Sequence, residues 1–237
     1  MSKLEDLIED LVTANRILAR HGIVDSYGHV SIRHPENTKR YLLSRARAPE
    51  RVESADIMEF TLEGDPVDAR GRRPYLERFI HGAIYEARPD VTAVVHNHSP
   101  GVIPFGITGT KLKPVMHMCA TIGHDVPIWD QRKKFGDTNL LVDSMKIGRD
   151  LAKLLGKGQT ALMRGHGSVV VGKNLRETVY TAIYLELNAR LQMQAMNMGT
   201  VKFLTKGEAE KYAATIPVTI NRPWENWCRA VNRPFRD

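Results

Sequence analysis

The chain has 237 residues, of which 42% are hydrophobic and 26% are charged, an ordinary composition for one substantial globular domain or two small ones. Disordered, collagen-like and coiled-coil chains are excluded. Lys and Arg number 34 against 27 Asp and Glu, so the formal net charge is +7 and anionic partners are favoured: nucleic acid, a membrane face or a small acidic molecule.

The two cysteines, Cys119 and Cys228, are too few for a disulfide framework and fit no C-x-x-C pattern, which favours a reducing compartment. The acidic start M-S-K-L-E-D is unlike a signal peptide, and no stretch offers the roughly 20 apolar residues of a membrane span. We therefore expect a cytoplasmic protein without a membrane partner.

The first quarter of the chain predicts a helix followed by three strands. Apolar residues between Leu4 and Leu18 recur at steps of three and four, which indicates an amphipathic helix that ends at His21-Gly22. Two short β-rich stretches, 27–33 and 41–44, are split by turn-forming residues and predict a hairpin. A third strand is expected at 57–61.

Helices and strands then alternate to the end of a long helix. Helical spacing covers 75–87 and stops before a proline, and the apolar run 91–98 predicts a strand. A further helix is expected at 139–155, a strand pair within 160–171, and a long helix at 175–198. No linker, repeat or low-complexity segment interrupts this order, which favours an α/β fold.

The C-terminal tail differs in kind, because Trp224 and Trp227 would be a costly exposed surface. We expect 217–237 to be a packing segment that lies on its own core or on a neighbouring subunit, and 1–237 to form a single domain.

The pattern H-N-H at the end of a predicted strand places His96 and His98 on one face. This is a chelating geometry, and it requires a third ligand. His166 is a candidate, since the glycines on both sides of it would let the backbone approach a bound ion. The spacing alone leaves open that these are two strand-end histidines, one hydrogen-bonded locally and one exposed.

A carboxylate precedes this pattern. Glu77 is expected in the 75–87 helix on the same face as His81, one turn later. Near a three-histidine metal site it would be a fourth ligand or a general acid/base. The alternative is a surface glutamate that pairs with Arg73 or Arg78.

Together these motifs resemble the class II aldolase/adducin family over nearly the whole chain. The resemblance rests on E-R-F-I-H from Glu77, Y-E-A-R-P-D-V from Tyr85, V-V-H-N-H-S-P from Val94 and G-H-G-S from Gly165. It implies a three-layer α/β/α class II aldolase-like fold with a central, mostly antiparallel sheet. It also implies a homotetramer with active sites at subunit interfaces.

The resemblance further implies one divalent metal ion per subunit on His96, His98 and His166, with Glu77 as the catalytic acid/base. Zinc, manganese, iron and cobalt all suit three neutral imidazoles. Adducin-like members are non-catalytic and lack the metal histidines, so the presence of all three favours an enzyme.

The chain departs from the sugar-phosphate aldolases of the family at the residues that bind phosphate. Tyr75 and Leu76 precede the glutamate, His29 occupies an asparagine position, and the loop after the second strand reads S-R-A-R-A-P from Ser44. This pattern resembles the branch that decarboxylates hydroxylated aromatic or pyridine dicarboxylates.

We therefore expect a lyase that removes carbon dioxide from a small acidic aromatic substrate, with the metal holding the ortho hydroxyl and stabilising the dienolate. Arg45 or Arg47 would hold a retained carboxylate. The expected substrate-binding residues are His29, Ser44, Arg45, Arg47, Tyr75 and His117.

Two other functions remain as alternatives. One is a metal-dependent aldolase that cleaves a hydroxy-aldehyde or sugar phosphate, and another is a non-catalytic, adducin-like interaction domain. Nucleic-acid binding is not expected, because the basic residues are scattered over separate loops and no nucleic-acid-binding motif is present.

Overall fold

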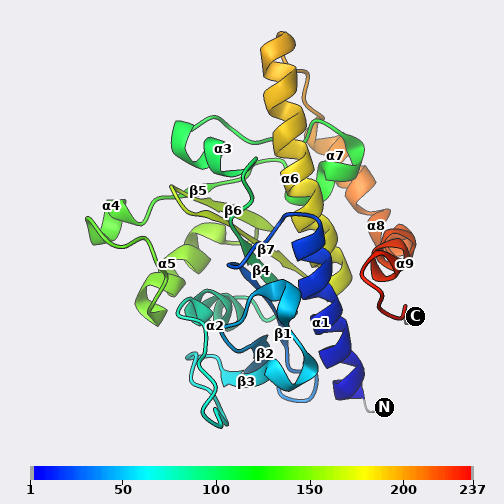
Figure 1. Ribbon diagram of the computed structural model, residues 1–237. Coiled ribbons are helices and arrows are strands. Elements are labelled where there is room, and N and C mark those ends of the chain that lie inside the picture. The colour runs from blue at the N-terminus through cyan, green and yellow to red at the C-terminus, as the bar shows by residue number, and fades with distance from the viewer. Residues whose placement is uncertain (1–2, 236–237) are drawn as a thin grey trace.

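The computed structural model describes residues 3–235, in which a seven-stranded sheet carries helices on both faces (Figure 1). The strands are β1 (His29–Arg33), β2 (Arg40–Ser44), β3 (Ile57–Thr61), β4 (Ala93–Asn97), β5 (Ile128–Trp129), β6 (Thr160–Met163) and β7 (Gly167–Gly172). The α-helices are α1 (Lys3–Arg20), α2 (Arg78–Ala87), α3 (Ile103–Thr108), α4 (Arg132–Phe135), α5 (Met145–Leu155), α6 (Leu175–Met198), α7 (Lys206–Ala213), α8 (Ile216–Thr219) and α9 (Asn221–Ala230). The 3-10 helices are η1 (Pro49–Arg51), η2 (Ser54–Asp56) and η3 (His117–Ile122).

The strand order is β3-β2-β1-β4-β7-β6-β5, and every neighbouring pair is antiparallel except β5 with β6. The α1, α6 and α9 helices lie on one side of this sheet, and α2 and α5 lie on the other (Figure 1). The predicted three-layer fold with a mostly antiparallel central sheet is confirmed.

Side chains of β4 alternate between two apolar cores, as a strand with a period of two requires. Ala93 and Val95 pack in the core under α1 and α6, whereas Val94 packs in the core under α2 and α5. His96 therefore follows Val94 onto the α2 side. The alternation of side chains along β4 thus determines that the imidazole of His96 lies on the same face of the sheet as α2.

Two predicted helices begin later than their spacing indicates. The α2 helix starts at Arg78 instead of 75, so Glu77 is its N-cap residue and does not share a helical face with His81. The residues before α2 are tied to the end of β2 and the loop after it, because the Tyr75 hydroxyl hydrogen-bonds to Ser44 and to the main-chain oxygen of Arg47. The α5 helix starts at Met145 instead of 139. The short elements β5, α3 and α4 were not predicted.

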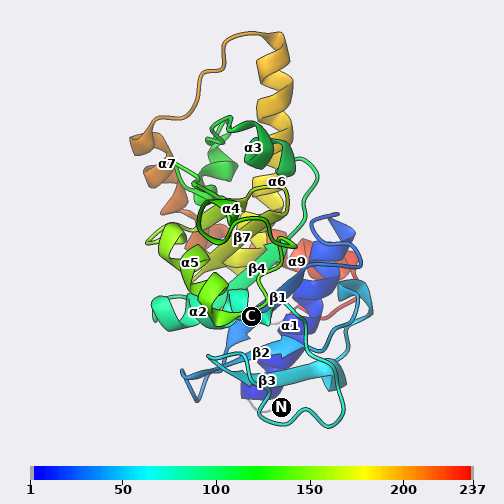
Figure 2. The same cartoon turned by 90° about the vertical axis from the view of Figure 1, so that its left-hand side faces the viewer.

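The C-terminal helices pack on the core of their own chain. Trp224 on α9 is fully buried, and Trp227 is nearly so, in the cluster that contains α1 and α6. Between α6 and α9, the last turns of α6 extend beyond the sheet and the chain returns to α7 (Figure 2). Of the predicted segment 217–237, residues 236 and 237 lie outside the described residues, and the single-domain assignment stays a prediction.

No helix within residues 3–235 combines the length and the apolar composition that crossing a bilayer requires.

Replacing Trp224 with Ala should destabilise the fold by about 3–5 kcal/mol, because the substitution leaves a cavity between α9 and the main core. Urea unfolding followed by circular dichroism measures this loss. Val218→Ala in the same tail is the control, since Val218 is 88% exposed and its truncation should change stability by less than about 0.5 kcal/mol. A similar small change for both variants would contradict the packing role of α9.

Candidate active site

Three imidazoles and one carboxylate converge beyond the end of β4. His96 is in β4, His98 follows the strand, His166 lies in the turn between β6 and β7, and Glu77 precedes α2. One ligand atom from each of these four residues lies within 4.8 Å of the others. The structure thus brings together all four residues that the sequence assigns to the metal and the acid/base.

The distances within this cluster suit a single divalent ion. The Nε2 atoms of His96 and His98 are 3.1 Å apart, and Oε2 of Glu77 lies 3.5 Å from Nε2 of His96 and 3.4 Å from Nε2 of His166. Ligand atoms that each lie about 2.0–2.2 Å from one ion are roughly 3.0–3.5 Å apart. The donor set therefore fits a divalent cation.

Hydrogen bonding orients the first of these ligands. Nδ1 of His96 lies 3.1 Å from the main-chain oxygen of Ser168, and a carbonyl oxygen only accepts, so Nδ1 is the donor. The hydrogen is therefore on Nδ1 and the lone pair of Nε2 points into the cluster. Metal-binding histidines are commonly oriented in this way, by a hydrogen bond from the other ring nitrogen to a carbonyl oxygen.

Electrostatics set the protonation states of the cluster. Burial, with the neighbouring His96 and His166, lowers the pKa of His98 to about 4, so this imidazole is neutral at pH 7. Burial by itself raises the pKa of Glu77, but contacts with His166 and His96 outweigh it and hold that pKa well below its usual range. At neutral pH the site therefore combines an anionic carboxylate with a neutral imidazole ligand.

Glu77 is also held from the loop before α5. Its Oε1 accepts a hydrogen bond of 2.9 Å from the main-chain nitrogen of Val142. The helix predicted over 139–155 would have withheld this donor, so the late start of α5 serves the site. The alternative of a surface glutamate paired with Arg73 or Arg78 is wrong, because Glu77 is buried and its ion-pair partners are His96 and His166.

The glycine after His166 is required for strand pairing and not, as expected, for approach of the backbone to an ion. A side chain at Gly167 would overlap the main-chain oxygen of Asn97 on the neighbouring β4 strand. Gly167 therefore permits close strand pairing, and its lack of a Cβ is not explained by approach to an ion.

A cavity of about 410 Å³ opens beside the cluster. It is lined by Ser26, Tyr27, Gly28, His29, Ala46, Arg47, Ala48, Pro74, Tyr75, Leu76, Glu77, His98 and Leu141. Tyr75 forms one wall, with its ring 4.6 Å from that of His29, and its hydroxyl accepts from Ser44 at 3.2 Å and donates to the main-chain oxygen of Arg47. A planar ligand that entered this cavity would meet the carboxylate of Glu77 and the imidazole of His98.

The expected substrate-binding residues divide into two groups. His29, Arg47 and Tyr75 line the cavity, and Ser44 supports Tyr75. Arg45 is not among the lining residues. His117 is not among them either, because it lies in η3 and packs edge-on against Tyr212, with ring centroids 4.6 Å apart.

Sequence reasoning missed Asp56, the residue that holds both arginines. Its buried carboxylate accepts from Nε of Arg45 at 2.6 Å and from Nη1 of Arg47 at 2.6 Å. Burial raises the pKa of Asp56, but a main-chain donor at Glu53 and the two arginines lower it overall. An isolated Asp after a loop carries no motif that would have indicated this role.

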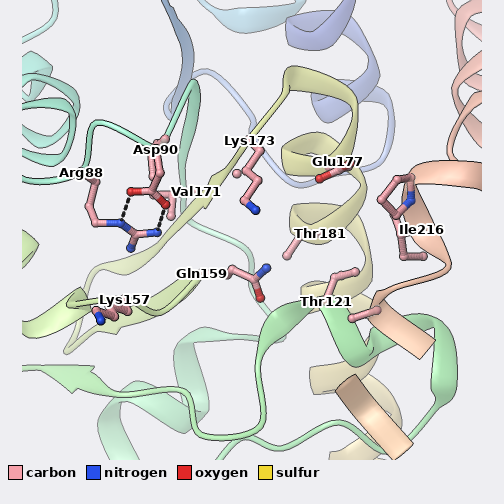
Figure 3. Close-up of a pocket in the computed structure, with 14 residues that line it drawn as sticks. Arg88, Asp90, Thr121, Lys157, Gln159, Val171, Lys173, Glu177, Thr181 and Ile216 are labelled. Atoms are coloured by element: carbon pink, nitrogen blue, oxygen red, sulfur yellow. Dashed lines mark hydrogen bonds and ion pairs between the residues drawn. The ribbon is translucent and has the colours of Figure 1, made fainter. Parts of the chain in front are cut away.

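A second cavity, of about 380 Å³, lies at the opposite end of β7 (Figure 3). Arg88 and Asp90 pair with each other there, and Lys173, Glu177 and Thr181 lie on the side of α6. Its lining residues include no histidine or cysteine, so it offers no comparable donor set.

Comparison with known proteins agrees with this geometry. Residues 9–193 match the family described as Class II Aldolase and Adducin N-terminal domain. Decarboxylase tropJ of Talaromyces stipitatus is 33% identical over 94% of this chain and 93% of its own length. The 3,4-dihydroxyphthalate decarboxylase of Arthrobacter keyseri is 28% identical over 81% of this chain and 79% of its own.

Among solved structures, L-fuculose 1-phosphate aldolase from Glaciozyma antarctica superposes with a TM-score of 0.75 at 25% identity, over 98% of this chain and 93% of that one. The relatives named as decarboxylases support a carbon–carbon lyase, and the histidine cluster is a candidate metal site. From the match over most of its length, the chain belongs to the class II aldolase and adducin family.

Proposed function

We propose that the protein is a divalent-metal-dependent, non-oxidative decarboxylase of a hydroxylated aromatic or pyridine carboxylate. The observation that carries this proposal is the convergence of three histidines and Glu77 beside a cavity that Tyr75 and Arg47 help to line. The relatives named as decarboxylases support the same reaction type.

The residues that would hold the ion are His96, His98 and His166. A divalent ion bound there would supply a Lewis acid that stabilises negative charge on the substrate oxygen ortho to the departing carboxylate. Zinc, manganese, iron or cobalt fits this donor set.

Glu77 moves the proton. As a carboxylate, it takes the proton of the ortho hydroxyl and then delivers it to the ring carbon that bears the leaving carboxylate. The bond between that carbon and the carboxylate breaks, carbon dioxide leaves, and the bond electrons restore the aromatic ring. The product oxygen regains a proton from water, so the net change is replacement of the carboxylate by hydrogen.

Arg47 is the better candidate for holding a retained carboxylate, because it lines the cavity and Arg45 does not. Asp56 fixes the Arg47 guanidinium through Nη1 at 2.6 Å, which leaves further N–H donors of the planar group for a ligand. The ring of Tyr75 forms a flat wall of the cavity, against which an aromatic substrate ring would stack.

An aldolase remains the second candidate, since the fold also matches an aldolase. The absence of small polar residues before Glu77 disfavours sugar-phosphate binding, whereas the Tyr75 wall favours an aromatic ligand. A non-catalytic, adducin-like role would not account for a complete metal-ligand set.

The proposal includes a cytoplasmic homotetramer with active sites at subunit interfaces. The exposed side chains of Tyr27 (69%) and Leu76 (64%) at the cavity support a neighbouring subunit or substrate that covers them. Cys119 is a buried free thiol, which supports a reducing compartment.

Glu77→Gln should retain the metal and lose turnover by about 10²-fold or more, because the amide neither takes nor delivers the proton. Carbon dioxide release from hydroxylated aromatic dicarboxylates measures turnover, and elemental analysis measures the metal. Activity near the wild-type level with full metal content would refute the acid/base role.

His166→Asn should lower both metal content and turnover, since it removes one of three imidazole ligands. His117→Asn is the matched control, and it should keep both because His117 packs against Tyr212 away from the cluster. Removing the ion with a chelator should abolish turnover, and re-adding zinc, manganese, iron or cobalt in turn identifies which ion restores it. Full activity of the chelator-treated, metal-free protein would exclude the metal role.

Arg47→Lys should raise the KM for a dicarboxylate by roughly tenfold to hundredfold, the effect of losing a charge-assisted bidentate contact of about 1.5–3 kcal/mol. The KM for the corresponding monocarboxylate should change little. Arg45→Lys is the control, because it also loses part of the Asp56 pairing without touching the cavity. Equal effects of the two variants would assign the loss to the Asp56 pairing instead of the substrate.

A further inference from the structure

The loop between α4 and α5 contacts the candidate active site through three consecutive residues. Cδ1 of Leu140 would lie 3.6 Å from a Cβ placed on Gly165, in the turn between β6 and β7. Leu141 lines the cavity, and the main-chain nitrogen of Val142 donates to Oε1 of Glu77 at 2.9 Å. The conformation of this loop therefore determines how the acid/base carboxylate is held.

The backbone of the loop is strained at Leu140, where φ is 64°. A residue with a side chain rarely adopts this left-handed conformation, because its Cβ approaches the neighbouring carbonyl oxygen. Oγ1 of Thr138 accepts a hydrogen bond from the main-chain nitrogen of Leu140 at 3.1 Å. Oδ1 of Asn139 accepts from that of Leu141 at 3.0 Å. Such strain persists only where surrounding contacts outweigh it, so those contacts impose the shape of the loop.

The peptide group between Leu141 and Val142 joins two side chains. Its nitrogen donates to Glu77, and its carbonyl oxygen accepts from Nε2 of Gln131 at 3.2 Å. A main-chain nitrogen only donates and a carbonyl oxygen only accepts, so the direction of both bonds is fixed. Hydrogen bonds in series polarise one another, and donation by Gln131 therefore strengthens the bond from Val142 to the carboxylate.

Gln131 is buried although one of its polar atoms is unpaired. It is 3% exposed, and its Oε1 has no hydrogen-bond partner among residues 3–235. An apolar side chain of similar size would bury no unpaired oxygen, so packing does not account for an amide at this position. The residue before it is anchored just after β6, because Oδ1 of Asp130 accepts from Nε of Arg164 at 2.7 Å. The backbone thus presents Gln131 as a firmly placed donor to the loop.

We propose that Gln131 is a positioning residue for Glu77. By holding the 141–142 peptide group, it keeps Oε1 of Glu77 on the main chain and leaves Oε2 facing the histidines, 3.5 Å from Nε2 of His96. The carboxylate then presents one fixed oxygen for the proton and does not turn to bind an ion through both oxygens. Gln131 is not among the residues that line the cavity, so it acts through Glu77. This inference rests on the proposed function, in which Glu77 moves the proton.

Two substitutions remove the donor. Gln131→Met keeps the length of the side chain without its amide, and Gln131→Asn keeps the amide on a side chain one methylene too short to reach Leu141. Gln192→Met is the matched control. Gln192 is 1% exposed and also donates through Nε2 to a main-chain oxygen, that of Lys111 at 2.8 Å, but it does not line the cavity.

Amide hydrogen exchange of the zinc-loaded protein, followed by nitrogen-15 NMR, measures the bond to Glu77 without turnover. Exchange at Val142 should be about tenfold faster in Gln131→Met and Gln131→Asn than in the wild type, because the loop holds that bond less firmly. It should be unchanged in Gln192→Met. An unchanged exchange rate at Val142 in either folded Gln131 variant would overturn the inference.

Kinetics separate positioning from a general loss of structure. In both Gln131 variants kcat should fall by about tenfold while KM and zinc content stay at their wild-type values, because only the proton-transfer geometry is disturbed. All three quantities should be unchanged in Gln192→Met. An unchanged kcat, or a parallel loss of zinc and rise in KM, would overturn the positioning role. If the wild type releases no carbon dioxide from hydroxylated aromatic acids, the proposed function fails, and the exchange rates still decide whether Gln131 holds Glu77.

Discussion

The register of β4 against β1 and β7 is the constraint on which the candidate active site depends. It places His96 opposite His29 on one side and Asn97 opposite Ser168 on the other. A slip of one residue would turn His96 toward the apolar core under α1 and α6. Gly167 makes this register possible, because any side chain there would meet the backbone of β4.

The same register orients the imidazole of His96 within the cluster. His96 donates from Nδ1 to a carbonyl of β7, which directs its lone pair toward Glu77 and the other histidines. An anionic Glu77 carboxylate beside the neutral imidazole of His98 is complementary to a divalent cation. Arg47, from the loop after β2, is paired with Asp56 and not with Glu77, so its guanidinium lies at the cavity beside the cluster.

A buried polar chain between β1 and α2 is costly unless its groups are paired, and here Ser31, His81 and Tyr85 all hydrogen-bond within it, with His81 also bonded to Nδ1 of His29. Arg33 closes its inner end by donating to the main-chain oxygens of Tyr85 and Val91 and stacking on the Tyr85 ring at 4.7 Å. Polar side chains replace apolar packing where β1 meets α2. This rigid backing fixes the cavity wall that His29 presents.

Local sequence patterns were sufficient for most of the strands and helices, whereas the full set of metal-ligand candidates came from the resemblance to the class II aldolase/adducin family. The H-N-H pattern at a strand end and the H-G turn are visible in the chain, because strand alternation and turn chemistry are local. The tertiary structure decided what depends on distant partners. Glu77 lies outside α2 and is held by Val142, Asp56 holds both arginines, and His117 lies away from the cavity. These differences share one physical reason: each arises from a hydrogen bond or packing contact between segments that are not neighbours in the sequence, and no periodicity within one segment encodes such a contact.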